Sequence, residues 1–155
     1  MSIPSLNQNG ELPEGDHVAT LIDVEIAFGL STDRRKHLTD GFKRAVDMFK
    51  AAGVEFVLVD GSYTTDKADP EDIDGCWSAS GDIDIAKIDP VFWKFSNSIE
   101  FQAQRVKAKA QYVLDFFIAE NIEAGSGKPF SDFFKTNREG DPKRIIKIVL
   151  NERCL

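Results

Sequence analysis

Two motifs on one stretch of the chain combine residue types suited to phosphate and metal chemistry. The apolar, β-branched segment 55–59 predicts a buried strand that ends in Gly61-Ser62, and nine residues separate this dipeptide from Asp72-Ile73-Asp74. Segment 72–77 predicts the next strand. Because residues i and i+2 of a strand point to the same face, about 6.6 Å apart along the chain, Asp72 and Asp74 present two carboxylates to one side.

This arrangement predicts a site for a nucleotide and a divalent cation. Carboxylates at this spacing suit Mg²⁺ or Mn²⁺, with substrate phosphates completing the coordination shell. Gly61 lets the backbone approach a phosphate closely, and Ser62 can donate hydrogen bonds to it. Lys67 can reach a triphosphate as a point charge, or it is an ordinary exposed lysine. Thr65 can add a phosphate hydrogen bond, although turn formation explains it equally well.

The chain contains a second Asp-x-Asp pair, Asp82 and Asp84, that serves as a comparison. In an acidic protein such a pair is usually solvated surface. No Gly-Ser precedes Asp82 at the corresponding distance, and we expect segment 81–89 to be a loop. The spacing and the preceding strand therefore distinguish Asp72 and Asp74.

The Gly-Ser and Asp-x-Asp pattern resembles the signature of the DNA polymerase β-type nucleotidyltransferase superfamily in its minimal bacterial form. Nearly the whole chain also resembles a family of uncharacterised bacterial and phage proteins. The stretches that carry this second resemblance are Leu12-Pro13-x-Gly15, Asp60 to Trp77, Ile88-Asp89-Pro90-Val91, Phe133-Phe134 and Pro142-Lys143. The resemblance implies a nucleotidyltransferase-like fold.

The superfamily uses a third carboxylate on a neighbouring strand, and our candidate is Asp115. Its neighbours in segment 113–118 are all apolar, so the carboxylate is expected to be buried. It then either completes a catalytic metal site with Asp72 and Asp74 or forms an ion pair with a core Arg or Lys. Glu120 is the reserve candidate. The last expected strand carries no acid, so the chain lacks the third carboxylate if the family's third carboxylate belongs there.

The elements expected around these motifs form an α+β fold in a single domain, 1–155. We expect a mixed sheet of about four strands with helices packed on it, resembling a nucleotidyltransferase, and a loose N-terminal arm at 1–16. The expected strands are 55–59, 72–77, 112–118, which we place centrally, and 144–150. The expected helices are 18–28, 31–52, 98–109 and 131–136, with a helical turn at 90–93 capped by Asp89 and a turn at 140–142. Ser31 or Thr32 can cap helix 31–52, Gly53 ends it, and its apolar residues form a one-sided stripe: Leu38, Phe42, Ala45, Val46 and Phe49.

Two further features remain open between a functional and a structural interpretation. Arg105, Lys107 and Lys109 lie on the expected helix 98–109 and could hold a nucleotide or an acceptor, or they form a solvated helix face. Trp77 could stack on a base, or it belongs to the core with most of the other aromatic residues.

Composition limits the classes of partner. The chain has 155 residues and a net charge of −7, which disfavours general binding to DNA or to an anionic membrane. Its two cysteines, Cys76 and Cys154, form no CxxC pair and fit a reducing cytoplasm. No uninterrupted apolar run approaches the length of a membrane span, and the first residues carry no signal-peptide pattern.

Together these features lead us to expect an enzyme that moves an NMP group from a nucleoside triphosphate to an acceptor hydroxyl. The acceptor would be a protein or an RNA such as a transfer RNA, by analogy with toxin–antitoxin or phage-defence modules. The alternative is a catalytically inactive module that binds a nucleotide or a basic partner protein, as an antitoxin does. A third possibility is an accessory protein whose acidic cluster binds a structural cation.

Overall fold

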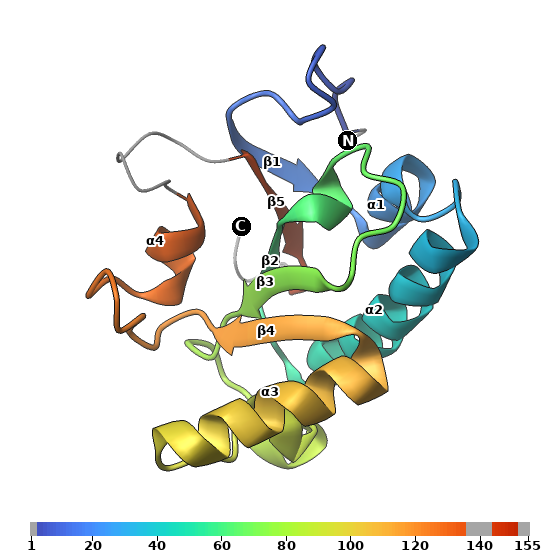
Figure 1. Ribbon diagram of the computed structural model, residues 1–155. Helices are drawn as coiled ribbons and strands as arrows, with labels where there is room; N and C mark the ends of the chain where they lie inside the picture. The colour runs from blue at the N-terminus through green and yellow to red at the C-terminus, as the bar shows by residue number, and fades with distance from the viewer. Residues whose placement is uncertain (1–2, 136–143, 152–155) are drawn as a thin grey trace.

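The computed structural model describes residues 3–135 and 144–151 and contains a five-stranded mixed sheet with helices packed against it (Figure 1). The strands lie in the order β1-β5-β2-β3-β4. Their bounds are β1 Gly15–Ala19, β2 Phe56–Asp60, β3 Ile73–Trp77, β4 Leu114–Ile118 and β5 Arg144–Val149. The α-helices are α1 Leu21–Phe28, α2 Asp33–Ala52, α3 Ser98–Tyr112 and α4 Phe130–Lys135. Short 3₁₀ turns cover Ser62–Thr64, Ile85–Lys87 and Pro90–Phe92.

The sheet is mixed, which confirms the α+β expectation, but its strand count differs from the expected four. Strand β1 pairs in parallel with β5, and β3 pairs in parallel with β4. Strand β2 lies between β5 and β3 and is antiparallel to both. The predicted helix 18–28 was wrong at its start, because Val18 belongs to β1 and the helix begins after the Thr20 cap.

The strand missed by sequence reasoning, β1, lies at an edge of the sheet. Its hydrogen-bonding partner β5 is more than 100 residues further along the chain, so local sequence carries little of its signal. The expected central position of the Tyr112–Ile118 strand was also wrong, because β4 forms the other edge. Its apolar density arises because both of its faces are packed, one against the α2 core and one against α4 aromatics.

The two faces of the sheet pack against different helices. One face meets α1 and α2 in the larger core, whose strand residues include Val57, Val59, Ile73, Trp77 and Phe116. The opposite face meets α4 through a smaller cluster that contains Leu58, Cys76, Phe117, Phe130 and Phe134. Because side chains alternate along a strand, the acids two positions from Leu58, Cys76 and Phe117 belong to this second face. These acids are Asp60, Asp74 and Asp115.

Several local predictions are confirmed. Helix α2 begins after the Thr32 cap and ends at Gly53, which adopts φ 92°. Asp89 caps the helical turn that follows it. Trp77 is fully buried and stacks on Phe49 with ring centroids 5.4 Å apart, so the base-stacking alternative was wrong.

Other expectations differ from the structure or lie outside its described part. Helix α3 extends to Tyr112, three residues beyond the expected end. Within the described residues, no helix has the length and apolar character needed to cross a membrane. Cys76 is a buried free thiol whose pKa is raised to about 12, mainly by burial. Cys154, the expected turn at 140–142 and the Pro142-Lys143 motif lie outside the described residues.

Candidate metal and nucleotide site

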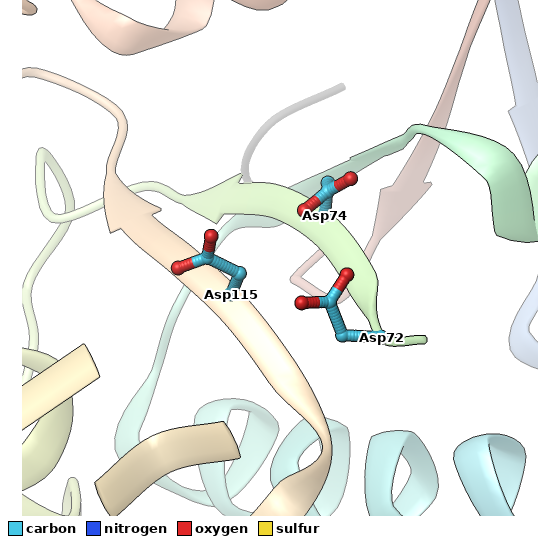
Figure 2. Close-up of side chains that lie close together, drawn as sticks. All are labelled: Asp72, Asp74 and Asp115. Atoms are coloured by element: carbon cyan, nitrogen blue, oxygen red, sulfur yellow. The ribbon is translucent and has the colours of Figure 1, made fainter. Parts of the chain in front are cut away.

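Three carboxylates from two neighbouring strands converge at one end of the sheet (Figure 2). Asp72 comes directly before β3, Asp74 lies within it, and Asp115 lies on β4 opposite Asp74 in the parallel register. One oxygen of each side chain lies within 4.8 Å of the others. Asp115 is 7% exposed, and the other two acids are half-buried. We call these three residues the acidic triad; among the described residues no other such group of three ligating side chains occurs.

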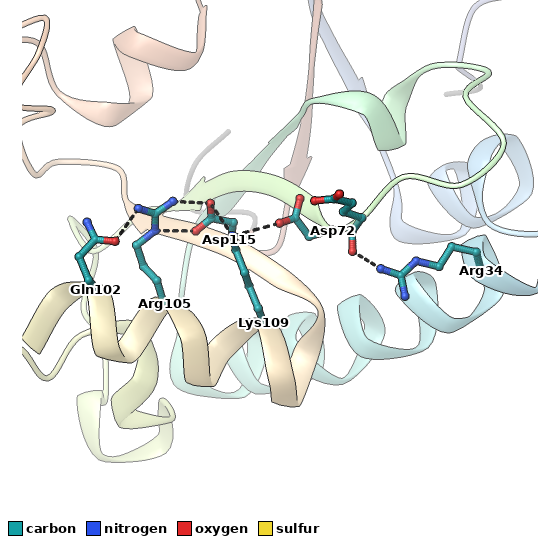
Figure 3. Close-up of polar contacts among 7 residues, drawn as sticks. Arg34, Asp72, Gln102, Arg105, Lys109 and Asp115 are labelled. Carbon is teal, nitrogen blue, oxygen red and sulfur yellow. Dashed lines mark hydrogen bonds and ion pairs between the residues drawn. The ribbon is translucent and has the colours of Figure 1, made fainter.

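Helix α3 supplies two cations to the acidic triad (Figure 3). Arg105 Nε donates to Asp115 Oδ1 at 3.0 Å, and its Nη2 donates to Asp115 Oδ2 at 2.7 Å. Lys109 Nζ lies 3.5 Å from Asp72 Oδ2 and 3.8 Å from Asp115 Oδ2. Asp115 therefore forms the ion pair that was one of the two expectations, and it also lies beside Asp72 and Asp74. A solvated-face interpretation was wrong for Arg105, whereas Lys107 is exposed.

One member of the acidic triad, Asp74, has a raised proton affinity. Burial, together with the nearby charges of Asp72, Asp115 and Asp60, raises the pKa of Asp74 from 3.8 to about 7. Lys109 opposes the shift but does not cancel it. Without a bound cation, Asp74 therefore holds a proton at a higher pH than an ordinary aspartate does. A divalent cation would relieve the same repulsion, so the donor set fits a hard metal ion.

The turn after β2 approaches Asp74 closely. Asp60 pairs with Asp74 in the antiparallel register, and Gly61 follows with φ 84°. A Cβ atom on Gly61 would lie 2.3 Å from Asp74 Oδ2, so this position accommodates glycine alone without rearrangement. The Thr65 hydroxyl donates to the Ser62 carbonyl at 2.7 Å, which confirms the turn-forming role for this threonine. Lys67 is exposed on the same loop.

Sequence reasoning missed the residue that organises this loop, Arg35. It is 2% exposed in α2, and its guanidinium donates to backbone carbonyls on both sides of the turn. The acceptors are the carbonyls of Phe28, Ser62, Tyr63, Thr65 and Lys67. The available signal was position: Arg35 lies three residues before Leu38 and so extends the apolar stripe of that helix. A cation on a buried stripe needs acceptors, and a loop rich in free carbonyls supplies them.

The remaining acidic candidates lie elsewhere. Glu120 accepts from the Ser78 hydroxyl at 2.9 Å and from the Ala79 N–H at 2.6 Å, so it closes a turn and is not a member of the acidic triad. Asp82 and Asp84 are both exposed, and Asp84 caps the 3₁₀ turn that follows it. The second Asp-x-Asp pair is therefore the solvated surface that we expected.

One comparison with known protein families gives a match. A family model described as "Family of unknown function (DUF6932)" matches residues 4–149, and the chain therefore belongs to this family. Comparisons with curated proteins and with solved structures find no significant match. The matched range includes the acidic triad and the loop 61–67.

Proposed function

We propose that the protein is a metal-dependent nucleotidyltransferase with a nucleotidyltransferase-like fold. It would bind a nucleoside triphosphate with Mg²⁺ or Mn²⁺ and transfer the NMP group to an acceptor hydroxyl. The observation that carries this proposal is the set of three carboxylate oxygens within 4.8 Å of one another, beside a glycine turn that touches Asp74. Hard oxygen donors suit a divalent cation and phosphate chemistry.

The roles of the chain's own residues follow from their positions. Asp72, Asp74 and Asp115 would hold the divalent cation. When bound, the cation would lower the pKa of the attacking hydroxyl and neutralise charge on the leaving pyrophosphate. Gly61 lets the turn approach Asp74 closely, and the half-buried Ser62 and Thr65 and the exposed Lys67 of the same loop would contact the triphosphate. This division needs no protein nucleophile, in keeping with transfer that depends on positioning and charge.

A specific observation favours the alternative of a catalytically inactive module. Arg105 occupies both oxygens of Asp115, and Lys109 lies between Asp115 and Asp72. These cations already partly neutralise Asp115 and Asp72, so a metal ion would have to compete with them. An inactive module would bind a nucleotide or a basic partner protein without consuming the nucleotide.

The experiment that tests the proposal compares two double variants with equal loss of charge. Asp72→Asn/Asp74→Asn removes two members of the acidic triad, and Asp82→Asn/Asp84→Asn removes the exposed second pair. We expect Mn²⁺–nucleoside triphosphate binding, measured by calorimetry, to be lost in the first variant and retained in the second. Equal affinities in the two variants would refute the site.

A turnover assay separates the enzyme from the inactive module. The wild-type protein is incubated with each α-labelled nucleoside triphosphate, Mg²⁺ or Mn²⁺, and a mixture of protein and RNA acceptors. Release of pyrophosphate with label on an acceptor supports transfer. Binding without pyrophosphate release supports the inactive module instead.

A further inference from the structure

A cleft of about 780 Å³ opens directly beside the acidic triad, and Asp74 and Arg105 belong to its wall. It lies among the start of α3, strand β4, segment 121–124 and α4. Its volume falls within the range of small-molecule sites. Six phenylalanines line it: Phe95, Phe101, Phe117, Phe130, Phe133 and Phe134.

The aromatic wall of this cleft is held in place by its own contacts. Phe117 and Phe130 stack with centroids 4.4 Å apart and planes at 12°. The Arg105 guanidinium lies 5.1 Å from the Phe117 ring centroid and 5.9 Å from that of Phe101. The same guanidinium holds Asp115, so the cleft and the acidic triad share a rigid element. A preformed aromatic wall favours a planar apolar ligand group.

The strand order separates this cleft from the proposed nucleotide turn. Gly61 follows β2, on one side of Asp74, whereas Phe117 and Arg105 lie on the β4 and α3 side. A ligand in the cleft would therefore approach the acidic triad from the side opposite the triphosphate. An acceptor hydroxyl must approach from that side, because attack and departure at phosphorus are roughly in line.

Building on the proposed function, we propose that the aromatic cleft binds the acceptor, and that the acceptor is a small molecule with a planar aromatic group next to its reactive hydroxyl. The hydroxyl oxygen forms a bond to the α-phosphorus, the bond from that phosphorus to the β-phosphate oxygen breaks, and pyrophosphate leaves with the electron pair. The hydroxyl proton is released to solvent. A chain with net charge −7 and a phenylalanine-lined cleft fits a small aromatic alcohol better than an RNA backbone.

The binding step is tested with 2-naphthalenemethanol as the probe, on the full chain in chelator and without nucleotide. Ile122→Asp places a charge in the lining of the cleft, and Ile99→Asp makes the same change on α3 outside it. Both isoleucines are exposed, 58% and 81%, so both variants are expected to fold, which a thermal melt verifies. We expect the probe to bind at least tenfold more weakly to Ile122→Asp and within twofold of wild type to Ile99→Asp. No binding to wild type at millimolar probe, or equal affinities in all three proteins, would overturn the proposal.

A second arm separates this proposal from the proposed function. With Mg²⁺ and nucleoside triphosphate, we expect wild type to form the naphthylmethyl ester of the NMP, and Ile122→Asp to form at least tenfold less. Label on RNA or protein but none on the probe would overturn the acceptor assignment and leave the transferase standing. Absence of triphosphate binding in the calorimetric experiment would refute the transferase and the acceptor role together, while the chelator titration would still decide whether the cleft binds an aromatic ligand.

Discussion

Replacing Asp74 with Asn should stabilise the metal-free protein at neutral and alkaline pH. Asp74 lies close to Asp72 and Asp115, and burial together with these charges raises its pKa from 3.8 to about 7. The folded protein therefore binds this proton more tightly than the unfolded chain does. The contribution to stability is complete below about pH 3.8 and is lost as the pH rises to about 7.

The size of the effect follows from the pKa difference. A tenfold change in proton affinity corresponds to about 1.4 kcal/mol. The full difference between the two pKa values would therefore destabilise the folded protein by about 4 kcal/mol above pH 7. Water reaches this half-buried side chain and Lys109 partly screens it. We therefore expect the free energy of unfolding of wild type to fall by about 2–4 kcal/mol between pH 4 and pH 8. For a chain of this size, that loss lowers the melting temperature by roughly 5–15 °C.

The assay is urea denaturation in chelator at pH 4, 5, 6, 7 and 8, on wild type, Asp74→Asn and the exposed control Asp84→Asn. The Asp74→Asn protein should lack most of the pH-dependent loss and be the most stable of the three at pH 8. Millimolar Mg²⁺ or Mn²⁺ should stabilise wild type and Asp84→Asn at pH 8 and leave Asp74→Asn much less affected. A stability difference between wild type and Asp74→Asn that does not change with pH would refute the argument, as would an Asp74→Asn protein that is less stable at pH 8.

Three other substitutions test the packing of the site. Gly61→Ala should destabilise the folded protein by about 1–3 kcal/mol, because φ at this position is positive and the new Cβ would collide with Asp74. A melting temperature equal to that of wild type would contradict the observed turn. Asp115→Asn should lower the free energy of unfolding by about 2 kcal/mol, which is less than the loss of a fully buried ion pair because Arg105 is partly exposed. An unchanged thermal melt with weakened Mn²⁺ binding would instead assign Asp115 to metal binding alone. Arg35→Lys keeps the charge but loses the planar guanidinium that donates to several carbonyls, so the free energy of unfolding measured in urea should fall by about 3 kcal/mol. A decrease below about 1 kcal/mol would show that the loop does not depend on Arg35.

Local sequence was sufficient for the elements that carry their own boundaries. Helix α2 has a capping threonine, a one-sided apolar stripe and a terminal glycine, and each was found where expected. Strands β2 and β3 are short apolar segments between turn residues, and alternation alone placed Asp74 away from the larger core. The apolar neighbours of Asp115 likewise predicted its burial.

The shape of the site required tertiary contacts between distant residues. The partner of Asp115 was open in the sequence, because whether Arg105 points to solvent or to β4 depends on how α3 packs after the chain reverses at Val113. The aromatic cleft joins α3 and α4, which pack around β4 from separate parts of the chain.

The sequence by itself determined the types and local spacing of the candidate site residues Gly61, Asp72 and Asp74, since all three belong to one short stretch and strand periodicity puts the two acids on one face. Only the tertiary structure decided that Asp115 stands beside Asp74, because the parallel register of β3 and β4 is set by hydrogen bonds between segments about 40 residues apart. It also decided that β1 completes the sheet and that Arg35 stabilises the loop 61–67 through hydrogen bonds. Such pairings depend on which surfaces are buried together, and no local pattern encodes that.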